Sequence, residues 1–494
     1  MTVSRADRAF LESLQCKRHG TAFTNWAGTF SSRPEFYVAP DTERAVIEII
    51  RIAGRSGLGV KAVGAGHSPS DLACTSAIMV SMDRMDRILA HDAYACTLTV
   101  EAGIRLHALH AALAQRGMAL SCVGSISDQS VGGAIATATH GSGVEFGDLS
   151  SCITHLVIVD ALGRRHECDP TANADLFDAA RCSLGALGIV TQVTLQCEPA
   201  FTLHAVQEPA AMDHVLDHFP SIATSAEHVR VWWFPHTEHT VVWRANRAAA
   251  AAAAAAAETT ATASMSPPAS YLRDTLYGVH YYQLQLLKAR ITPNDIPRLA
   301  EEHFQRRFNR RIEWTDASYR VFNFDCLFPQ YVNEWAVPLD QAAGALRELR
   351  AWLSTQSLDP HGVRAHFPVE IRFVRASDVW LSPAYNQLVC YIGVIMYRPF
   401  RQPVPYKKYW RAFEDIMRTH SGRPHWAKAH RMFYFDLRKA YPRFDDFVRL
   451  RAACDPDGVF VNNYIRRHIL PPDEPAPVAD SCERRAFALE SPKL

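Results

Sequence analysis

The sequence predicts a protein of the α+β class in which two domains each combine helices and strands. Three observations support this prediction. The chain has 494 residues, enough for two large domains. Residues 36–199 alternate between strand and helix patterns, and a second region of this kind follows over residues 201–423. A low-complexity insert at residues 248–270 interrupts the second region.

The first region, taken as residues 20–200, contains clear helix and strand signals. A helix is predicted over residues 42–56, where Thr42 can cap the first turn and apolar residues recur at helical spacing. Another helix is predicted over residues 106–116, where Gly117 ends it. Short runs rich in β-branched residues predict strands over residues 59–63, 76–81, 97–101, 153–160 and 188–196.

The second region, residues 201–423, predicts a helix over residues 339–353 and strands over residues 368–374 and 388–396. Its insert begins with an unbroken alanine run, for which we expect a surface loop or a frayed helix without a catalytic role. Residues 424–470 are rich in aromatic and basic side chains. The tail, residues 471–494, is rich in Pro, Glu, Asp and Ala, which predicts poor order.

Composition excludes several classes of function. The 52 basic and 51 acidic residues give a net charge of +1, so neither nucleic acid nor an anionic membrane is an expected partner. No apolar run reaches the roughly 18 residues of a transmembrane helix, although peripheral membrane contact stays open. The 12 cysteines form no CxxC pairs, so we expect an intracellular, reducing setting and no metal site. The final Pro-Lys-Leu weakly resembles a peroxisomal signal; a glycosome-like organelle or association with mitochondria is an alternative.

A glycine-rich loop follows the strand predicted at residues 59–63. Its sequence, VGAGHSPSD over residues 63–71, combines two glycines, a histidine and two hydroxyl groups. Backbone amides in such a loop can approach a pyrophosphate closely. Pro69 occupies the position where the dinucleotide fingerprint needs a third small residue, so a nicotinamide site is not indicated. Taken alone, the loop could equally be a structural turn.

Two further segments are unusually rich in small residues. Residues 124–143 (GSISDQSVGGAIATATHGSG) contain few charges and would expose apolar surface without a ligand. Small residues there would let the backbone lie against a flat ligand. Residues 183–191 (SLGALGIVT) lead into a strand, with glycines that could serve a simple turn.

Together these segments resemble the vanillyl-alcohol oxidase flavoprotein superfamily and, within it, the aldonolactone oxidoreductases. The resemblance begins at Asn25-Trp26-Ala27-Gly28 and extends to about residue 469. Its later motifs are EIR at residues 370–372, WLSPAY at 380–385, RPHWAK at 423–428 and DPDGVF at 455–460. The resemblance implies an FAD-binding domain of two α/β subdomains over residues 20–200 and a cap domain over residues 201–423. It also implies that residues 424–470 return to the flavin.

The resemblance implies FAD as the cofactor, with FMN as an alternative on the residues alone. His67 matches the family histidine that bonds covalently to the flavin 8α carbon, a role that suits a neutral imidazole. A non-covalent flavin that His67 merely contacts is the alternative. The other predicted cofactor contacts lie in the three segments above: Ala65, Gly66, Ser68, Ser70, Gly124, Ser125, Ser130, Gly132, Gly133, Thr137, His140, Gly141, Ile189 and Val190.

By the same resemblance, Glu370, Arg372 and Lys428 are the predicted catalytic and substrate-binding residues. Glu370 and Arg372 lie two apart on a predicted strand and therefore share a face. The expected substrate is a D-arabinono-, L-galactono- or L-gulono-1,4-lactone, oxidised at C2 to an ascorbate-type product. Arg372 and Lys428 would stabilise negative charge, and Glu370 would orient Arg372 and bind the hydroxyl group. Ser125 would contact substrate or flavin.

Two positions bear on the electron acceptor and the substrate. In the family, a glycine at the position of Gly124 accompanies oxygen use and an alanine accompanies dehydrogenases, so O2 reduction to H2O2 is expected. A lactone dehydrogenase is the alternative. Alditol oxidases of the superfamily carry a His-x-Thr pair where this chain has Gly393 and Ile395, which favours a cyclic lactone. An alditol oxidase and a flavin carrier without turnover are the remaining alternatives.

Overall fold

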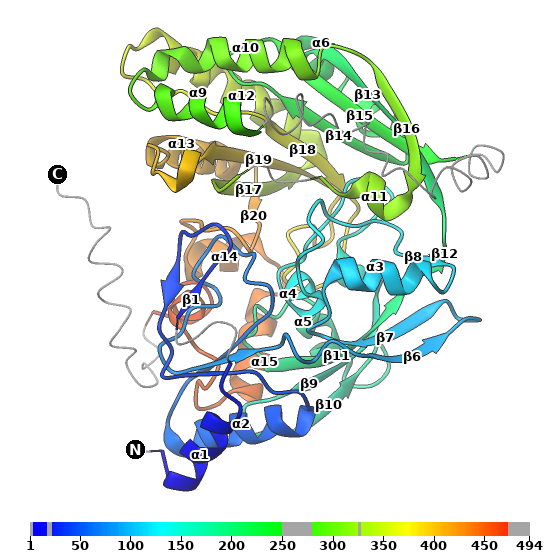
Figure 1. Cartoon of the computed structure of the whole chain (residues 1–494), viewed down its shortest axis with the longest axis vertical. Coiled ribbons are helices and arrows are strands. Elements are labelled where there is room, and N and C mark those ends of the chain that lie inside the picture. The colour runs from blue at the N-terminus through cyan, green and yellow to red at the C-terminus, as the bar shows by residue number, and fades with distance from the viewer. Residues whose placement is uncertain (1–2, 17–21, 249–278, 325–327, 473–494) are drawn as a thin grey trace.

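The computed structural model describes residues 3–16, 22–248, 279–324 and 328–472. The predicted insert from residue 249 onward, and the tail from residue 473 with its Pro-Lys-Leu ending, lie outside the described residues. The described chain forms two halves (Figure 1). A three-stranded and a five-stranded sheet build the first half, and an eight-stranded sheet builds the second. The predicted α+β class is confirmed.

The three-stranded sheet of the first half is parallel, in the order β3-β5-β4. Its strands are β3 (Phe36–Val38), β4 (Val60–Val63) and β5 (Ile78–Ser81). Helix α2 (Glu43–Ser56) packs its apolar face in the same core, and α1 (Arg5–Ser13) adds Leu11 to it. The α2 prediction is confirmed: the Thr42 side chain accepts from Ala45 N, and Gly57 ends the helix at φ 67°.

The five-stranded sheet is antiparallel, in the order β10-β9-β11-β7-β6. Its strands are β6 (Ile88–Asp92), β7 (Thr97–Glu101), β9 (Ile153–Val159), β10 (Arg165–Cys168) and β11 (Ile189–Gln196). Around it lie α3 (Leu106–Ala114), α4 (Val131–Ala136), η1 (Leu149–Cys152) and α5 (Ala174–Ala180). Short strand pairs add β1 (Phe23–Thr24) with β2 (Ser31–Ser32), and β8 (Met118–Ala119) with β12 (Glu198–Pro199).

The eight-stranded sheet is antiparallel, in the order β16-β13-β15-β14-β18-β19-β17-β20. Its strands are β13 (Thr202–Ala211), β14 (His228–Trp233), β15 (His239–Arg247), β16 (Ile312–Ala317), β17 (Gln330–Pro338), β18 (Val369–Val374), β19 (Val389–Tyr397) and β20 (Arg423–Pro424). Because β20 pairs with β17, the predicted boundary at residue 423 falls inside a strand of this sheet.

Helices cover much of the eight-stranded sheet. They are α6 (Met212–Asp217), α7 (Phe219–Ala223), α9 (Tyr282–Ala289), η3 (Pro293–Asp295), α10 (Ile296–Arg307), α11 (Ser318–Phe322), α12 (Leu339–Leu358), η4 (Pro399–Arg401) and α13 (Lys407–Thr419). On β17, Asn333 donates to Glu414 of α13. Glu334, the next residue on the strand, therefore points to the opposite face. That face is directed toward the first half and carries the candidate site described below.

The last described segment returns to the first half, where Figure 1 shows α14 (Tyr434–Ala440) and α15 (Phe444–Cys454). Helix α16 (Asn463–His468) follows. The buried Asp455 carboxylate accepts from the backbone of Val459 and Phe460, and Val459 O accepts from Val60 N at 2.7 Å. This contact joins the end of the chain to β4, the strand that leads into the glycine-rich loop.

Among the residues that the structure describes, no helix has the length and apolar character needed to span a bilayer. The ten cysteines in the described ranges are all free thiols.

Candidate active site

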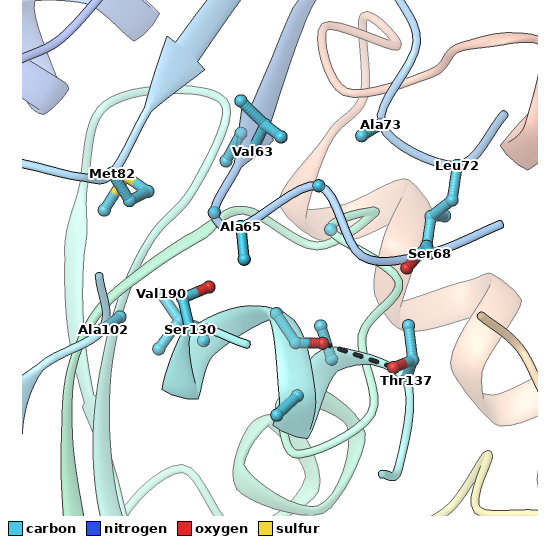
Figure 2. Close-up of a pocket in the computed structure, with 18 of the residues that line it drawn as sticks. Val63, Ala65, Ser68, Leu72, Ala73, Met82, Ala102, Ser130, Thr137 and Val190 are labelled. Atoms are coloured by element: carbon cyan, nitrogen blue, oxygen red, sulfur yellow. Dashed lines mark hydrogen bonds between the residues drawn. The ribbon is translucent and has the colours of Figure 1, made fainter. Parts of the chain in front are cut away.

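A cleft runs through the first half between the glycine-rich loop and α4. Figure 2 shows the chain from Val63 to Ser68 running above the start of α4, with Met82 and Ala102 to one side. Ten of the predicted cofactor contacts line this cleft: Ala65, Gly66, His67, Ser68, Ser130, Gly132, Gly133, Thr137, Ile189 and Val190. The three small-residue segments of the sequence therefore meet around one cavity.

The glycine-rich loop has a shape that side chains would prevent. Gly66 adopts φ 66°, a left-handed conformation that favours glycine. A β-carbon on Gly64 would overlap Ser130 Oγ on α4. The Asn25-Trp26 motif fixes the loop from outside, because Trp26 N donates to Gly66 O at 2.8 Å and Asn25 Nδ2 donates to Ser68 O at 3.0 Å.

The C-terminal segment supports the other end of this loop. Asn462 Nδ2 donates to the carbonyl oxygens of Leu72 and Cys74, each at 2.9 Å. Arg467 forms an ion pair with Asp71 at 2.8 Å. Residues some 390 positions apart thus shape one wall of the cleft.

His67 lies on the cleft wall with both ring nitrogens buried and without a hydrogen-bond partner among the described residues. Its ring stacks on Trp26 with centroids 5.9 Å apart. Burial lowers the pKa of His67, which keeps the imidazole neutral near pH 7. A neutral, unpartnered nitrogen at a ligand cavity is available as a nucleophile.

Lys61 is a cleft residue that the sequence analysis missed. It is buried on β4, and its ammonium donates to Leu184 O at 2.9 Å and Gly185 O at 3.2 Å. Burial lowers its pKa to about 7. A lysine between the apolar neighbours Val60 and Ala62 was the signal that could have identified it.

Five predicted cofactor contacts lie outside this cleft. Ser70 is buried, with its hydroxyl unpartnered among the described residues. Ser125 lines a neighbouring cavity that it shares with His67. Gly124 lies against the backbone of His140, which is buried together with Gly141 at the junction of the two halves.

Residues 140–143 leave the first half and enter the eight-stranded sheet between β14 and β18. Gly143 N donates to Phe373 O at 2.7 Å, and Phe373 N donates to Ser142 Oγ at 3.1 Å. On the β14 side, His228 Nδ1 lies 2.9 Å from Ser142 O. We call residues 140–143 the junction segment. It brings the His140 side chain onto the sheet face that bears the catalytic candidates.

Strand register places these candidates together. Glu370 on β18 pairs with Gly393 on β19, which pairs with Glu334 on β17. Two residues further along β18, Arg372 pairs with Tyr391 on β19. Paired residues and residues two apart on a strand share a face. Both carboxylates and Arg372 therefore project from the same side of the sheet.

Glu334 is the centre of this cluster and was absent from the sequence prediction. Its carboxylate accepts from Arg372 Nη2, and Lys428 Nζ lies 3.4 Å from its second oxygen. His140 Nε2 lies 3.5 Å from the first oxygen. The loop that carries Lys428 is held by the same residue, because His425 N donates to Glu334 O at 3.0 Å. A carboxylate inside a largely apolar strand was the missed signal.

The charges of this cluster are mutually stabilised. Burial alone would raise the pKa of Glu334, but Arg372, Lys428 and the contact with His140 lower it well below its usual value. Burial opposes the charge of Arg372 as well, yet the neighbouring carboxylates raise its pKa. Burial lowers the pKa values of His140 and His425; Arg372 lowers both further, and Lys428 also lowers that of His425. Both imidazoles are therefore neutral beside an ionised Glu334.

His140, Glu334 and His425 bring possible ligand atoms within 4.8 Å of one another. A metal ion there would have to compete with Arg372 and Lys428 for the same carboxylate. We therefore interpret the three residues as part of the ion-pair cluster.

Arg230 connects this cluster to the cleft. It pairs with Arg372 in the strand register and is fully buried. Its guanidinium donates to Ser125 Oγ at 3.3 Å and to Phe322 O at 3.0 Å. Since Ser125 and His67 line one cavity, the cluster lies beside the cofactor cleft.

Comparison with known proteins identifies the family. A family model described as D-arabinono-1,4-lactone oxidase matches residues 193–468, more than half of the chain. The chain belongs to this family. A model described as an FAD binding domain matches residues 34–169.

Family relatives match over most of the chain. An L-gulonolactone oxidase from Scyliorhinus torazame is 40% identical over 450 residues, which cover 91% of this chain and 98% of the relative. An L-gulono-1,4-lactone dehydrogenase from Mycobacterium tuberculosis is 33% identical over 451 residues, covering 91% and 99%. A crystal structure of cholesterol oxidase from B. sterolicum shares the fold, with a TM-score of 0.74, 16% identity, and coverage of 91% of this chain and 97% of that one.

The cleft suits the FAD that this family uses. Glycine or alanine at positions 64, 65, 66, 132 and 133 lets backbone amides reach a ligand. The neutral, unpartnered His67 ring faces the same cavity. Ser130 and Thr137 add hydroxyl groups along the wall.

Proposed function

We propose that this protein oxidises the C2 hydroxyl group of an aldono-1,4-lactone and reduces O2 to H2O2. The names of the family and of its relatives support the substrate class. The observation that carries the proposal is the meeting of Glu370, Arg372 and Lys428 around Glu334, beside the cleft. A D-arabinono-, L-galactono- or L-gulono-lactone would give an ascorbate-type product. The free thiols of the described cysteines favour an intracellular location.

Each candidate residue has a distinct task in this reaction. Bound FAD would supply the acceptor for the hydride that leaves C2. Glu370, whose side chain is 29% exposed, is placed to accept the proton of the C2 hydroxyl group. Arg372 and Lys428 stabilise the negative charge that grows on that oxygen. Since Glu334 already holds both cations, they are oriented before the substrate binds.

Gly393 places no side chain between the two carboxylates on the sheet face. This residue separates Glu370 from Glu334, and a β-carbon there would meet its nearest atoms at 3.7 Å. Ile395, two residues on, packs against an aromatic cluster. Neither side chain offers a polyol a hydrogen bond, which supports a lactone over an open-chain alditol.

Anaerobic mixing tests the substrate. The purified protein would be mixed with the three lactones and with xylitol, and flavin absorbance followed before and after air is admitted. We expect bleaching by at least one lactone and recovery in air. Bleaching by xylitol alone would indicate an alditol oxidase, and no bleaching would reject the proposal. Slow recovery would indicate a dehydrogenase.

The oxidase assignment rests on Gly124. A β-carbon here would lie 3.3 Å from His140 O and Thr139 Cγ2, so an alanine would tighten this region. We predict that Gly124→Ala slows reoxidation by O2 about ten-fold, because the added methyl group would narrow the approach of O2 to the flavin; a ten-fold change corresponds to about 1.4 kcal/mol in the activation barrier. The rate of bleaching by lactone should change little. Stopped-flow measurement of both half-reactions checks this, and equal reoxidation rates would contradict it.

We further propose that His67 bonds covalently to the flavin. Acid precipitation should then leave flavin on the wild-type protein, whereas His67→Ala should release nearly all of it. The reason is that the unpartnered ring nitrogens of His67 face the cleft. His107→Ala is the matched control, since His107 is exposed and lines a second cavity that His67 also borders. Release of flavin from the wild type would show that it is non-covalent.

A further inference from the structure

The candidate site contains two carboxylates with different surroundings. Glu334 and Glu370 stand on either side of Gly393 and project from one face of the sheet. The Glu334 side chain is 4% exposed and the Glu370 side chain 29%. Two acids whose surroundings differ this much are expected to perform different tasks.

Glu334 is fully engaged by its neighbours. One carboxylate oxygen accepts from Arg372 and lies 3.5 Å from His140 Nε2, while the other lies 3.4 Å from Lys428 Nζ. Its backbone oxygen also holds the loop that carries Lys428. Protonation of this carboxylate would weaken the ion pairs of both Arg372 and Lys428, so it is a poor proton acceptor.

Glu370 is only weakly engaged. Its nearest ion-pair contact is to Arg372 Nε at 3.6 Å, beyond hydrogen-bond distance. The guanidinium of Arg372 is directed instead toward Glu334, two strands away. This leaves the Glu370 oxygens available to a substrate hydroxyl group.

We propose that Glu334 is the positioning residue of this site: it holds Arg372 and Lys428 in their working orientations and thereby leaves Glu370 free to take the substrate proton. This inference rests on the proposed lactone oxidation, which it deepens. Glu334 itself does not act on the substrate.

The central test is Glu334→Gln, studied as the flavin-loaded full chain. The amide keeps the shape but removes the charge that orients both cations. We expect kcat and kcat/KM to fall together by about 100-fold, since the stabilisation lost is realised in the transition state. KM should change little. Glu334→Asp keeps the charge and should recover part of the lost kcat, and it provides a second variant if the glutamine variant does not fold.

Glu414→Gln is the matched control. Glu414 is equally buried and accepts from Asn333 and Arg431, but it lies on the opposite face of β17. This variant should lower thermal stability while leaving kcat near the wild-type value. It thus measures the effect of neutralising a buried carboxylate away from the site.

A double-mutant cycle separates positioning from a structural role. If Glu334 acts through Lys428, Glu334→Gln should lower kcat much less in the Lys428→Met variant than it does in the wild type. The same cycle with Arg372→Met tests the other cation. Losses that are additive in both cycles, or wild-type kcat in Glu334→Gln, would overturn the inference while wild-type lactone oxidation keeps the proposed function intact. A wild-type protein that oxidises no lactone would instead reject the proposed function itself.

Discussion

Replacing Arg372 by methionine should lower kcat with an aldonolactone by about 10²–10³-fold. The substitution removes the cation that faces both Glu334 and Glu370. Lys428 stays within ion-pair distance of Glu334, but one of the two cations assigned to the substrate oxygen is lost. Steady-state kinetics with the best lactone of the panel checks this expectation.

Two further variants control this measurement. Arg372→Lys keeps the charge but loses the forked geometry, so its kcat should lie between those of the wild type and the methionine variant. Arg364→Met removes another buried arginine, whose guanidinium donates, within the described ranges, to backbone oxygens such as Gln356 O and Asp359 O. Its kcat should stay near the wild-type value. A methionine variant at position 372 with wild-type kcat would contradict the assigned role.

Acidification should destabilise the protein steeply. Burial lowers the pKa values of five histidines from 6.5: to about 4 for His110 and His228, and to about 3 for His303, His366 and His430. In the unfolded chain these imidazoles take up protons near pH 6.5, whereas in the folded protein they remain neutral. Their contribution is therefore complete above pH 6.5 and is lost as pH falls toward 3–4.

By pH 5 each imidazole removes about 2 kcal/mol from the free energy of unfolding. The loss from two imidazoles, about 4 kcal/mol, is already close to the lower end of the 5–15 kcal/mol free energy of unfolding that is typical of folded proteins. Urea unfolding can be followed by circular dichroism at several pH values between 8 and 5. The urea concentration at the midpoint should decrease once the pH is below 6.5.

A single buried histidine provides a control for this acid effect. His303 lies among Tyr282, Phe308 and Phe367, with its Nδ1 unpartnered among the described residues. His303→Phe should reduce the loss of stability between pH 6.5 and pH 5 by about 2 kcal/mol. His91→Gln, at an exposed position on β6, should leave the loss unchanged. A urea midpoint independent of pH would contradict the expectation.

The helices and strands that the sequence predicted are present in the structure because their local signals agree with the fold. The 42–56 helix has its cap and its glycine stop where the residues indicate them, and the strand at residues 97–101 has the predicted bounds. The helix at residues 106–116 ends at Ala114, two residues early, and Gly117 adopts φ 67° just beyond it. The helix predicted over residues 339–353 continues to Leu358, because residues 354–358 contain no glycine or proline.

The candidate site was less predictable because it depends on strand register. Glu370 and Arg372 belong to a motif, so they could be selected from one segment. Glu334 can be recognised as a site residue only from the sheet order, in which β19 lies between β17 and β18 and Gly393 pairs with both Glu334 and Glu370. Likewise, the contact of His140 with Glu334 depends on the path of the junction segment into the sheet. Long-range pairing of this kind has no local sequence signal.

The junction segment limits how freely the two halves can be exchanged between relatives. Residues 140–143 belong to the nucleotide-binding half, yet they complete the hydrogen bonding of β14 and β18 in the other half. A chimaera that received only residues 201–424 from a homologue would contain the homologue's β14 and β18. Its residues 140–143 would still come from the recipient protein, so the two parts would not have been matched to each other. Specificity engineering by domain grafting should therefore transplant the junction segment, residues 140–143, along with residues 201–424.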